Sequence, residues 1–490
     1  MILKNKINKV LVLIFFCFCA SIFSIKHNLT NFDKLKPLLP CSGFSDSPGW
    51  ECATNYHVMI KNDLHRYHSH GYEIKKDLIN GKNYLETGRQ NFTKYLPPRI
   101  IAAYYYLFNY DLFEASTKKE IKLGIHSKYL FIQCLIYFLS LFYFYNILKK
   151  KTSKRVCFFT LIFLGLEPTI FQYHATFWTE SIFFSLQILL VGLILNNKNN
   201  YINFLTIGFF LGITALYRTH ALIYIIPVII YFLFILEKKN YYKILFTIFS
   251  FSLVMSFVGY HNYVRAGNFY IVPNEVKTVF HTYVAPQIID KKEFNDQKEE
   301  ALRWMKNNNI YIDIKKLRKY EYNRFAFVLC ESTFLENEKD KVKVCNYLND
   351  QAIKMLIENP LLTFKYVLKK SVTFPLLNPF HIYSDHRFPS GESYYKSDTW
   401  YKVLPYRIIY SLIIYSIVLL GLFKMFRERN ILENNKILLI TIFSIIFFFS
   451  TASWHGNTRY FVPIMIYLSL FFGSGSVLII DFLKNKKLII

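Results

Sequence analysis

The stretch YLFIQCLIYFLSLFYFYNILKKKTSKRVCFFTLIFLGL, Tyr129–Leu166, joins two apolar runs through the basic turn KKKTSKR. A helix that crosses the hydrocarbon core of a bilayer, roughly 30 Å thick, needs about 20 mostly apolar residues. A short loop rich in Lys and Arg between two such runs is typical of the cytoplasmic side. The stretch therefore predicts two membrane helices joined on that side.

The composition extends this prediction to the whole chain. Its 490 residues are 53% hydrophobic and 19% aromatic, which is more apolar than is usual for a soluble domain of this size. We expect an all-α polytopic membrane protein: a bundle of about ten transmembrane helices with interfacial helices and a large extracytoplasmic loop domain. The expected spans are residues 9–25, 127–147, 155–173, 178–196, 201–217, 219–236, 243–260, 406–423, 437–453 and 460–480.

The distribution of basic residues predicts the orientation. The first span follows the basic segment MILKNKINK and has the form of a signal peptide or of a signal anchor; we favour an anchor, because the loops would otherwise change sides. The short inside loops then carry nineteen Lys and Arg, whereas the short outside turns carry only Arg218 and Arg459. Both termini are predicted to be cytoplasmic, and the outside is a bacterial periplasm or an organelle lumen.

Three parts follow from this topology. Residues 1–260 form an N-terminal bundle that includes a first outside loop, 26–126; residues 261–405 form an extracytoplasmic loop domain; residues 406–490 form the C-terminal membrane helices. Membrane orientation explains most of the formal net charge of +26, so we expect no nucleic-acid partner.

Four cysteines lie in the two long outside segments, in an oxidising compartment. The local pairings are Cys41 with Cys52 and Cys330 with Cys345, one of three connectivities, and free thiols are the alternative. The His-rich segment NDLHRYHSHGYE, 62–73, does not have the spacing of a standard metal-ligand set, and we interpret it as a hydrated loop.

Polar residues gather at the predicted outer ends of the spans: His174, Glu180, Arg218, His220, His261, Arg265, His455 and Arg459. Arg218 and Arg459 are candidates for phosphate contact, because a guanidinium can donate two hydrogen bonds to phosphate oxygens, although both could simply end their spans at the interface. His174 and His455 are either substrate contacts or interfacial caps. Glu180 is either a site residue or a favourable anion at a helix N-terminus.

The first outside loop offers the candidate base. Asp46 lies inside the loop that a Cys41–Cys52 bridge would close, although SDSPG is also an ordinary turn sequence, and Asp63 is the substitute. Further along, Pro97-Pro98 in KYLPPR predicts the start of an interfacial helix. Glu167 is a carboxylate inside a predicted span, where an acid is either functional or paired with a neighbouring helix.

Taken in order, several motifs resemble one family. They are the outside aspartate, YLPPR, EPTIFQYHATFWTESIFFSLQILL, GITALYRTHALIYIIP, YVRAGNFYIVPN and NTRYFVPIMIYL. Their succession, over roughly 1–270 and 400–480, is similar to the GT-C superfamily of integral membrane glycosyltransferases, above all to protein O-mannosyltransferases and the aminoarabinose transferases of lipid A.

The resemblance implies an enzyme that transfers a hexosyl or pentosyl group from a polyprenyl-phosphate donor to a protein, lipid or glycan acceptor, with inversion, on the extracytoplasmic face. It makes Asp46 the general base, with Asp63 as the alternative, and makes Glu180 part of the TES element. It assigns lipid-phosphate contact to Arg218 and Arg459. The remaining candidates for substrate or lipid-phosphate contact are His174, His455, Tyr460, Arg265 and Arg99.

The chain departs from the family pattern in the first loop. The family has an acidic pair followed closely by Tyr, but here Asp46 is followed by Ser47 and the next tyrosine is Tyr56. The scheme requires no cofactor, and although a divalent metal stays open, no ligand pattern indicates one.

Two other classes stay open at this point. A polysaccharide polymerase or O-antigen ligase also uses a lipid-linked donor with Arg and His in outside loops, and only the YLPPR and TES elements argue against it. A lipid or solute transporter would place ionisable groups near the bilayer midplane and would often have related halves, whereas here the polar residues lie at the outer rim.

Overall fold

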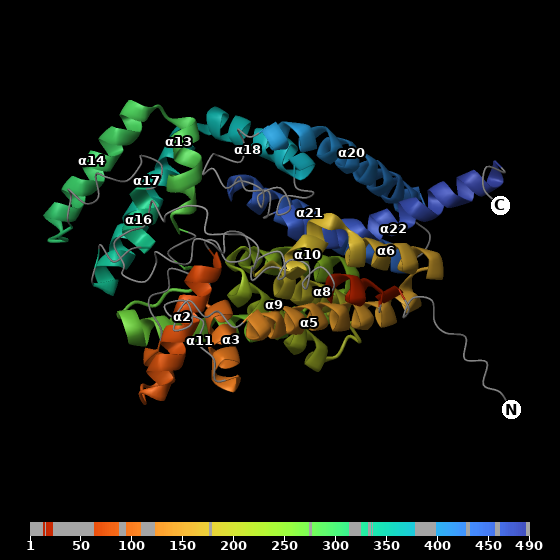
Figure 1. Ribbon diagram of the computed structural model, residues 1–490, viewed down its shortest axis with the longest axis horizontal. Coiled ribbons are helices and arrows are strands. Elements are labelled where there is room, and N and C mark those ends of the chain that lie inside the picture. Colours follow the sequence, from red (N-terminus) through yellow and green to blue (C-terminus); the bar gives the residue numbers. More distant parts are fainter. Residues whose placement is uncertain are drawn as a thin grey trace.

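The computed structural model describes residues 13–22 except 15, 63–87, 95–108, 123–175, 179–273, 277–312, 325–331, 335, 337–377, 398–427, 432–455 and 461–486. Every regular element in these ranges is a helix, as the sequence predicts (Figure 1). Helical residues 13–14 and 16–22 pack on α5, where the centre of the Phe18 ring lies 5.7 Å from that of Phe131 and 5.4 Å from that of Phe138.

The apolar helices form one bundle. Within the described ranges, four are long and apolar enough to cross a membrane: Lys128–Lys151, Lys238–Arg265, Leu404–Arg427 and Val462–Asn485. Four shorter apolar helices accompany them: Glu180–Leu195, Tyr201–Tyr217, Thr219–Ile235 and Lys436–Thr451. A multi-pass membrane fold follows, whereas the predicted number of ten spans is not confirmed. The helices of the bundle are α5 (Leu123–Lys151), α6 (Lys154–Leu166), α7 (Pro168–Phe171), η3 (Gln172–Ala175), α8 (Glu180–Leu195), α9 (Tyr201–Tyr217), η4 (Thr219–Tyr224), α10 (Ile225–Ile235), η5 (Lys238–Asn240), α11 (Lys243–Ala266), α20 (Asp398–Arg427), α21 (Leu432–His455) and α22 (Val462–Asn485).

The remaining helices belong to the two predicted outside segments. In the first segment they are α2 (Asp63–Ile79), η2 (Tyr84–Glu86) and α3 (Leu96–Leu107), and in the second they are the π-helical turn η6 (Phe280–Val284), α13 (Ala285–Ile288), α14 (Lys291–Asn307), α16 (Phe325–Glu331), α17 (Glu338–Glu358) and α18 (Pro360–Leu377). The His-rich segment is therefore helical from Asp63 onward, and the prediction of a hydrated loop there is wrong.

The predicted continuous span 155–173 is also wrong. The helix α6 ends at Leu166, and Glu167 has an extended backbone before α7 starts at Pro168. Proline disfavours a helical conformation of the residue before it and has no N–H to continue the ladder. The Glu167 carboxylate then accepts a hydrogen bond from the Ile170 N–H at 3.1 Å and one from the Tyr410 hydroxyl at 3.3 Å. The intramembrane acid thus caps a short helix and links it to α20.

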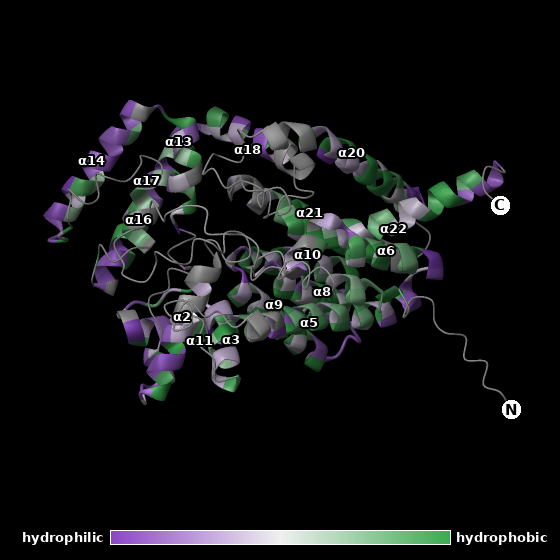
Figure 2. Cartoon of the chain, in the orientation of Figure 1, coloured by the Kyte–Doolittle hydropathy of each residue, from purple (hydrophilic) through white to green (hydrophobic). Residues whose placement is uncertain are grey.

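Basic residues mark one end of the bundle. They occupy the last turns of α5 (Lys149, Lys150, Lys151), α20 (Lys424, Arg427) and α22 (Lys484). Figure 2 shows hydrophilic residues at this end and along α14, with hydrophobic residues along the bundle helices. An exposed ion pair, Arg155 to Asp481 at 2.8 Å, joins α6 to α22 there. The predicted cytoplasmic loops therefore share one end, whereas α2, α3, α14 and α17 lie toward the other (Figure 1).

Glycines allow the closest helix contacts. A Cβ on Gly421 of α20 would collide with the Phe471 carbonyl of α22, and one on Gly475 of α22 would collide with the Ile417 carbonyl of α20. Small residues are common at helix interfaces in membranes, because they let two backbones approach each other. The α20–α22 pair therefore depends on the missing side chains at these two positions.

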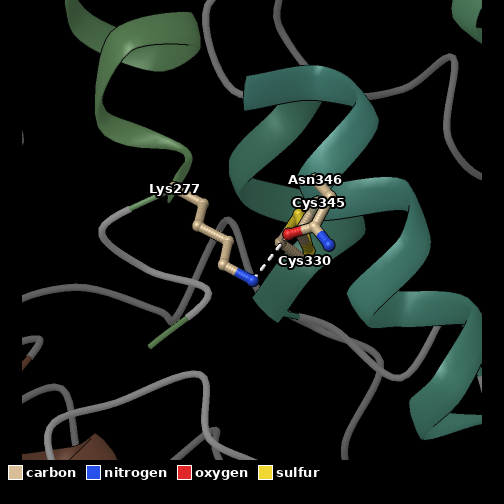
Figure 3. The surroundings of a disulfide bond; sticks show 4 residues. All are labelled: Lys277, Cys330, Cys345 and Asn346. Carbon is tan, nitrogen blue, oxygen red and sulfur yellow. Dashed lines mark hydrogen bonds between the residues drawn. A yellow bond between two sulfur atoms is a disulfide. The ribbon is translucent and has the colours of Figure 1, made fainter. Parts of the chain in front are cut away.

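The second outside segment has two small cores of its own. One lies among α14, α16 and α17 and contains the disulfide Cys330–Cys345, which is the pairing that the sequence predicts (Figure 3). Beside it, Lys277 donates a hydrogen bond to Asn346 Oδ1 at 2.6 Å. The other core lies among η6, α13, α17 and α18 and takes in Trp454 from the end of α21. This second core thus joins the outside segment to the membrane bundle. The other predicted pair, Cys41 and Cys52, lies outside the described residues.

We predict that Gly421→Val destabilises the protein, because the new side chain forces α20 away from α22. Overpacking of this kind costs about 1–3 kcal/mol. Leu420→Val, at the neighbouring position, is the control, since Leu420 is 42% exposed on the outside of the bundle. Thermal unfolding of the purified variants in detergent checks this, and equal midpoints for the two variants would contradict the close α20–α22 contact.

We also predict a pH-dependent stability from His281 on η6. This side chain is buried, with its ring centre 4.9 Å from that of Phe294, and burial lowers the pKa of His281 to about 4. Because the unfolded chain takes up the proton first, near pH 6.5, stability is complete above that pH and falls by up to about 1.4 kcal/mol per unit as the pH drops toward 4. Unfolding midpoints compared between about pH 7 and pH 5 should shift less in His281→Gln than in the wild type. Equal shifts in the two proteins would count against this role.

Candidate functional site

Two predicted site residues, Arg99 and Arg265, meet at the ends of α3 and α11. The α3 helix begins after Tyr95, with prolines in its first turn where a missing N–H costs nothing, and this start places Arg99 one turn in. The α11 helix ends at Gly267, whose φ of 68° is the left-handed conformation that glycine adopts without strain at a helix C-terminus. Arg265 thus lies in the last turn of α11, and His261 one turn before it.

Hydrogen bonds tie α3 to α11 through His261. The Tyr95 hydroxyl lies 2.7 Å from His261 Nδ1, and Arg99 Nη2 lies 3.3 Å from the same nitrogen. Since a guanidinium can only donate, Nδ1 is an acceptor, which assigns a neutral imidazole with its proton on Nε2. A second Arg99 nitrogen, Nη1, donates to the Tyr95 carbonyl at 2.7 Å. His261 itself is fully buried.

Aromatic rings enclose the Arg99 guanidinium. Its central carbon lies 3.5 Å from the centre of the Tyr95 ring and 5.8 Å from that of Tyr84 on η2. Such contacts favour the cation through the ring quadrupole. We call Tyr84, Tyr95, Arg99, His261 and Arg265 the cationic cluster.

The cationic cluster holds two guanidinium groups near each other, and this affects the pKa of Arg99. Burial, and then the charge of Arg265, lower the pKa of Arg99 from its usual value, while the neighbouring tyrosines oppose that shift. Burial raises the pKa of the Tyr95 hydroxyl. Among the described residues, no carboxylate contributes to the shift at Arg99. Arg99 is therefore a cation held next to a second cation, a setting that a bound anion would stabilise.

A second pair of predicted residues, Glu180 and Arg218, forms a buried ion pair. Arg218 Nη1 lies 2.7 Å from Glu180 Oε1, and neither side chain has any exposure. Glu180 is the first residue of α8, whereas Arg218 has an extended backbone between α9 and η4. The Phe183 ring centre lies 5.3 Å from the guanidinium. The Arg218 guanidinium thus has a carboxylate as its partner, whereas no described carboxylate contributes to the pKa shift of Arg99 in the cationic cluster.

His174 lies in a packed interior setting beside this pair. Its Nδ1 lies 2.9 Å from the Ser181 hydroxyl, and its ring is tilted by 47° against the Tyr137 ring, with 4.2 Å between ring centres. Gln133 on α5 donates to its backbone carbonyl at 2.9 Å. These contacts hold the turn before α8 against α5, so His174 positions the TES element in this structure.

Comparison with known proteins gives one family. Residues 94–288 match the model of the Alg9-like mannosyltransferase family. Over these residues the chain is similar to Alg9-like mannosyltransferases. The predicted resemblance to GT-C membrane glycosyltransferases is thereby confirmed, and the matched family is a family of hexosyltransferases. The matched residues include the whole cationic cluster apart from Tyr84, and also Glu180 and Arg218.

Two solved structures are also similar, although only weakly. The archaeal oligosaccharyltransferase AglB from Archaeoglobus fulgidus, in complex with an inhibitory peptide and a dolichol-phosphate, matches 96% of this chain at 11% identity and a TM-score of 0.46. The Archaeoglobus fulgidus oligosaccharyltransferase tethered to an acceptor peptide matches 98% at 10% identity and the same TM-score. The chain spans about half the length of those proteins, since 51% of each is covered. No curated protein sequence matches it.

The structure covers only part of the predicted site. Asp46, Arg459 and Tyr460 lie outside the described residues. Asp63 and His455 are described in backbone only, as the first residue of α2 and the last of α21. Within the part of the chain that the structure describes, no group of three or more His, Cys, Asp or Glu could hold a metal ion.

The sequence-based site set also missed two members of the cationic cluster, Tyr84 and Tyr95, and it included His261 only as one of the polar residues at the outer ends of the spans. His261 carried a usable pattern, because it lies one helical turn before Arg265 near the end of a predicted span. Tyr84 and Tyr95 had none, since tyrosines are frequent throughout this chain. Arg407, on α20, is a further buried arginine that the prediction did not include.

We predict that breaking the Glu180–Arg218 pair is strongly destabilising. Glu180→Gln leaves a buried guanidinium without its counter-charge, and removing one partner of such a pair costs about 3–5 kcal/mol. Glu180→Gln combined with Arg218→Gln should cost less than the sum of the two single changes. Thermal unfolding in detergent measures all four proteins of this cycle.

The exposed pair Arg155–Asp481 supplies the matched control for this cycle. Its side chains are 61% and 44% exposed, so Arg155→Gln should cost no more than about 1 kcal/mol. If Glu180→Gln loses no more stability than Arg155→Gln, then the buried Arg218 guanidinium does not need the Glu180 carboxylate to balance its charge.

Proposed function

We propose that the protein transfers a hexose, with mannose as the first candidate, from a polyprenyl-phosphate donor to an acceptor on the extracytoplasmic face of the membrane. The observation that carries this proposal is the cationic cluster, where Arg99 and Arg265 meet at the ends of α3 and α11 away from the basic end of the bundle. The match to a mannosyltransferase family supports the choice of sugar. The dolichol-phosphate in the similar AglB complex agrees with the donor class.

The cluster suits the phosphate of such a donor. Two guanidinium groups can each present paired N–H donors to phosphate oxygens. Tyr95 and His261 fix the orientation of Arg99 before any ligand binds, so little ordering is needed on binding. Because α11 is apolar along its length, a lipid tail that runs down its side keeps the phosphate at the level of Arg265.

The buried ion pair then has a separate role. Glu180 neutralises Arg218 in this structure, so a phosphate contact by Arg218 requires exchange of one anionic partner for another. Tyr217, next to Arg218, contacts Tyr129, whose ring centre is 5.3 Å from that of Tyr104 on α3. We propose that the pair holds the wall behind the cationic cluster and that Arg459 adds a second phosphate contact.

The transfer needs a base on the far side of the sugar from the phosphate. A carboxylate of Asp46 or Asp63 takes the proton of the acceptor hydroxyl, and the oxygen attacks the anomeric carbon. The bond from that carbon to the phosphate oxygen breaks, and its electron pair stays on the phosphate, where Arg99 and Arg265 stabilise the charge. The single displacement inverts the anomeric centre.

Asp63 has one structural argument in its favour. It begins α2, and α2 packs tightly on α3, since a Cβ on Gly71 would lie 2.8 Å from Ile101 Cγ2 and 2.9 Å from the Pro98 carbonyl. The helix that carries Asp63 is thus fixed to the helix that carries Arg99.

We predict that Arg99→Ala and Arg265→Ala each weaken binding of polyprenyl phosphate at least tenfold, because each removes a charged hydrogen-bond donor worth about 1.4 kcal/mol or more. Binding is measured with the purified protein in lipid nanodiscs, so no acceptor is needed, and polyprenol without phosphate is the ligand control. Arg303→Ala is the protein control, since Arg303 is exposed on α14. Equal affinities for the phosphate and for the alcohol would reject the proposed site.

Transfer of radiolabelled mannose from polyprenyl-phosphate mannose into acceptors of the host membrane identifies the base. Either Asp46→Asn or Asp63→Asn should abolish transfer and leave donor binding intact, because only the proton acceptor is lost. If both variants transfer mannose as fast as the wild type, the base lies elsewhere. If the wild-type protein binds the donor but transfers no mannose, mannose is rejected as the sugar.

A further inference from the structure

An apolar face at the α17–α18 corner has no partner in the described part of the chain. Four side chains stand out there: Ile357 at 71% exposure, Leu361 at 77%, Phe364 at 63% and Leu368 at 53%. Leu361, Phe364 and Leu368 follow the three-and-four spacing of one helix face. We call these four residues the α18 stripe.

The corner itself is well ordered by hydrogen bonds, so the stripe has a fixed direction. Asn359 caps the end of α17 through the Met355 carbonyl at 3.1 Å. Thr363, in the first turn of α18, donates through its hydroxyl to the Leu356 carbonyl at 3.2 Å. Pro360 then starts α18 without needing a hydrogen bond of its own.

The buried face of the α17–α18 corner packs on the bundle and so fixes the height of the corner relative to the bundle helices. Ala352, Met355 and Tyr366 are buried in the core that takes in Trp454, near the end of α21. Tryptophan is enriched at the interface between membrane and water. The α18 helix also packs on α20 and α21 (Figure 1). The stripe therefore lies beside membrane helices, at the height of an interfacial tryptophan.

Continuity of apolar surface favours lipid as the occupant. On α20, which α18 contacts, the outward side chains Tyr406, Ile409 and Leu412 are 73%, 55% and 54% exposed. These residues begin a helix that is apolar enough to cross the membrane. The stripe and the outer surface of α20 thus form neighbouring parts of one apolar surface.

The charges of α18 agree with a lipid surface. Its sequence, PLLTFKYVLKKSVTFPLL, contains three lysines and no acidic residue. Lys365 and Lys369 are exposed beside the stripe, one helical turn apart. An apolar face bordered by lysines is the pattern of helices that lie in a membrane interface, where the ammonium groups reach lipid phosphates.

We propose that the α18 stripe inserts into the extracytoplasmic leaflet of the bilayer, with Leu361, Phe364 and Leu368 among the acyl chains and with Lys365 and Lys369 at the phosphates of anionic phospholipids. The second outside segment is then anchored to the membrane surface by α18 as well as by its core contact with α21. This anchoring is independent of the transfer reaction.

The test places a tryptophan in the stripe. Phe364→Trp is reconstituted in nanodiscs of phosphatidylcholine and phosphatidylglycerol, with and without bromine on the acyl chains, and the fluorescence of the parent protein is subtracted. Loss of most of the added emission in brominated lipid is the expected result. Tyr311→Trp, at a site 82% exposed in the same segment, is the control and should not be quenched.

The lysines are tested in the same assay. Lys365→Gln combined with Lys369→Gln, in the Phe364→Trp background, should reduce quenching in membranes that contain phosphatidylglycerol more than in pure phosphatidylcholine. Unquenched emission at long wavelength, which acrylamide can reach, would place the stripe in water and overturn the proposal. Unquenched emission at short wavelength, with cross-linking between copies, would also overturn it and would assign the stripe to a second copy of the chain.

Discussion

A charge buried inside a membrane bundle has to be neutralised where it lies, and the Glu180–Arg218 pair is the contact on which the arrangement of the other helices depends. It fixes the start of α8 and the end of α9 at one depth. The α9 helix then packs on α11 at Gly208, where a Cβ would collide with the Thr247 carbonyl. Through α9, the ion pair therefore sets the depth at which α11 ends and at which it presents His261 and Arg265.

The two arginine sites differ in how their charge is balanced. Arg218 has a carboxylate at 2.7 Å, whereas Arg99 has tyrosine rings, a neutral histidine and a second arginine near it. The first arrangement is complete without a ligand. The second becomes more favourable when an anion binds, because the anion attracts both guanidinium groups and offsets the repulsion between them. Sequence position alone does not distinguish them, since both arginines lie in predicted outside loops or turns.

Local sequence patterns correctly predicted those parts of the fold that depend on residues close together in the chain. Hydropathy located the long helices, the basic turns placed Lys149–Lys151 and Lys424 at one end, and the short separation of 15 residues indicated the Cys330–Cys345 pair. The break at Glu167 was missed, because apolar residues on both sides of it concealed the effect of Pro168. The contact of Arg99 with His261 joins residues 162 positions apart, and only the packing of α3 on the bundle brings them together.

The second outside segment shows why the membrane helices and the outer helices act as one unit. Its inner core takes Trp454 from α21, and α18 continues from that core along α20. A segment held at two places on the bundle can rotate little relative to it. Because α20 packs on α22 through Gly421 and Gly475, a shift of α18 would have to move a contact that has no free space. The position of the outer helices is therefore linked, through α20, to the close α20–α22 contact near the basic end of the bundle.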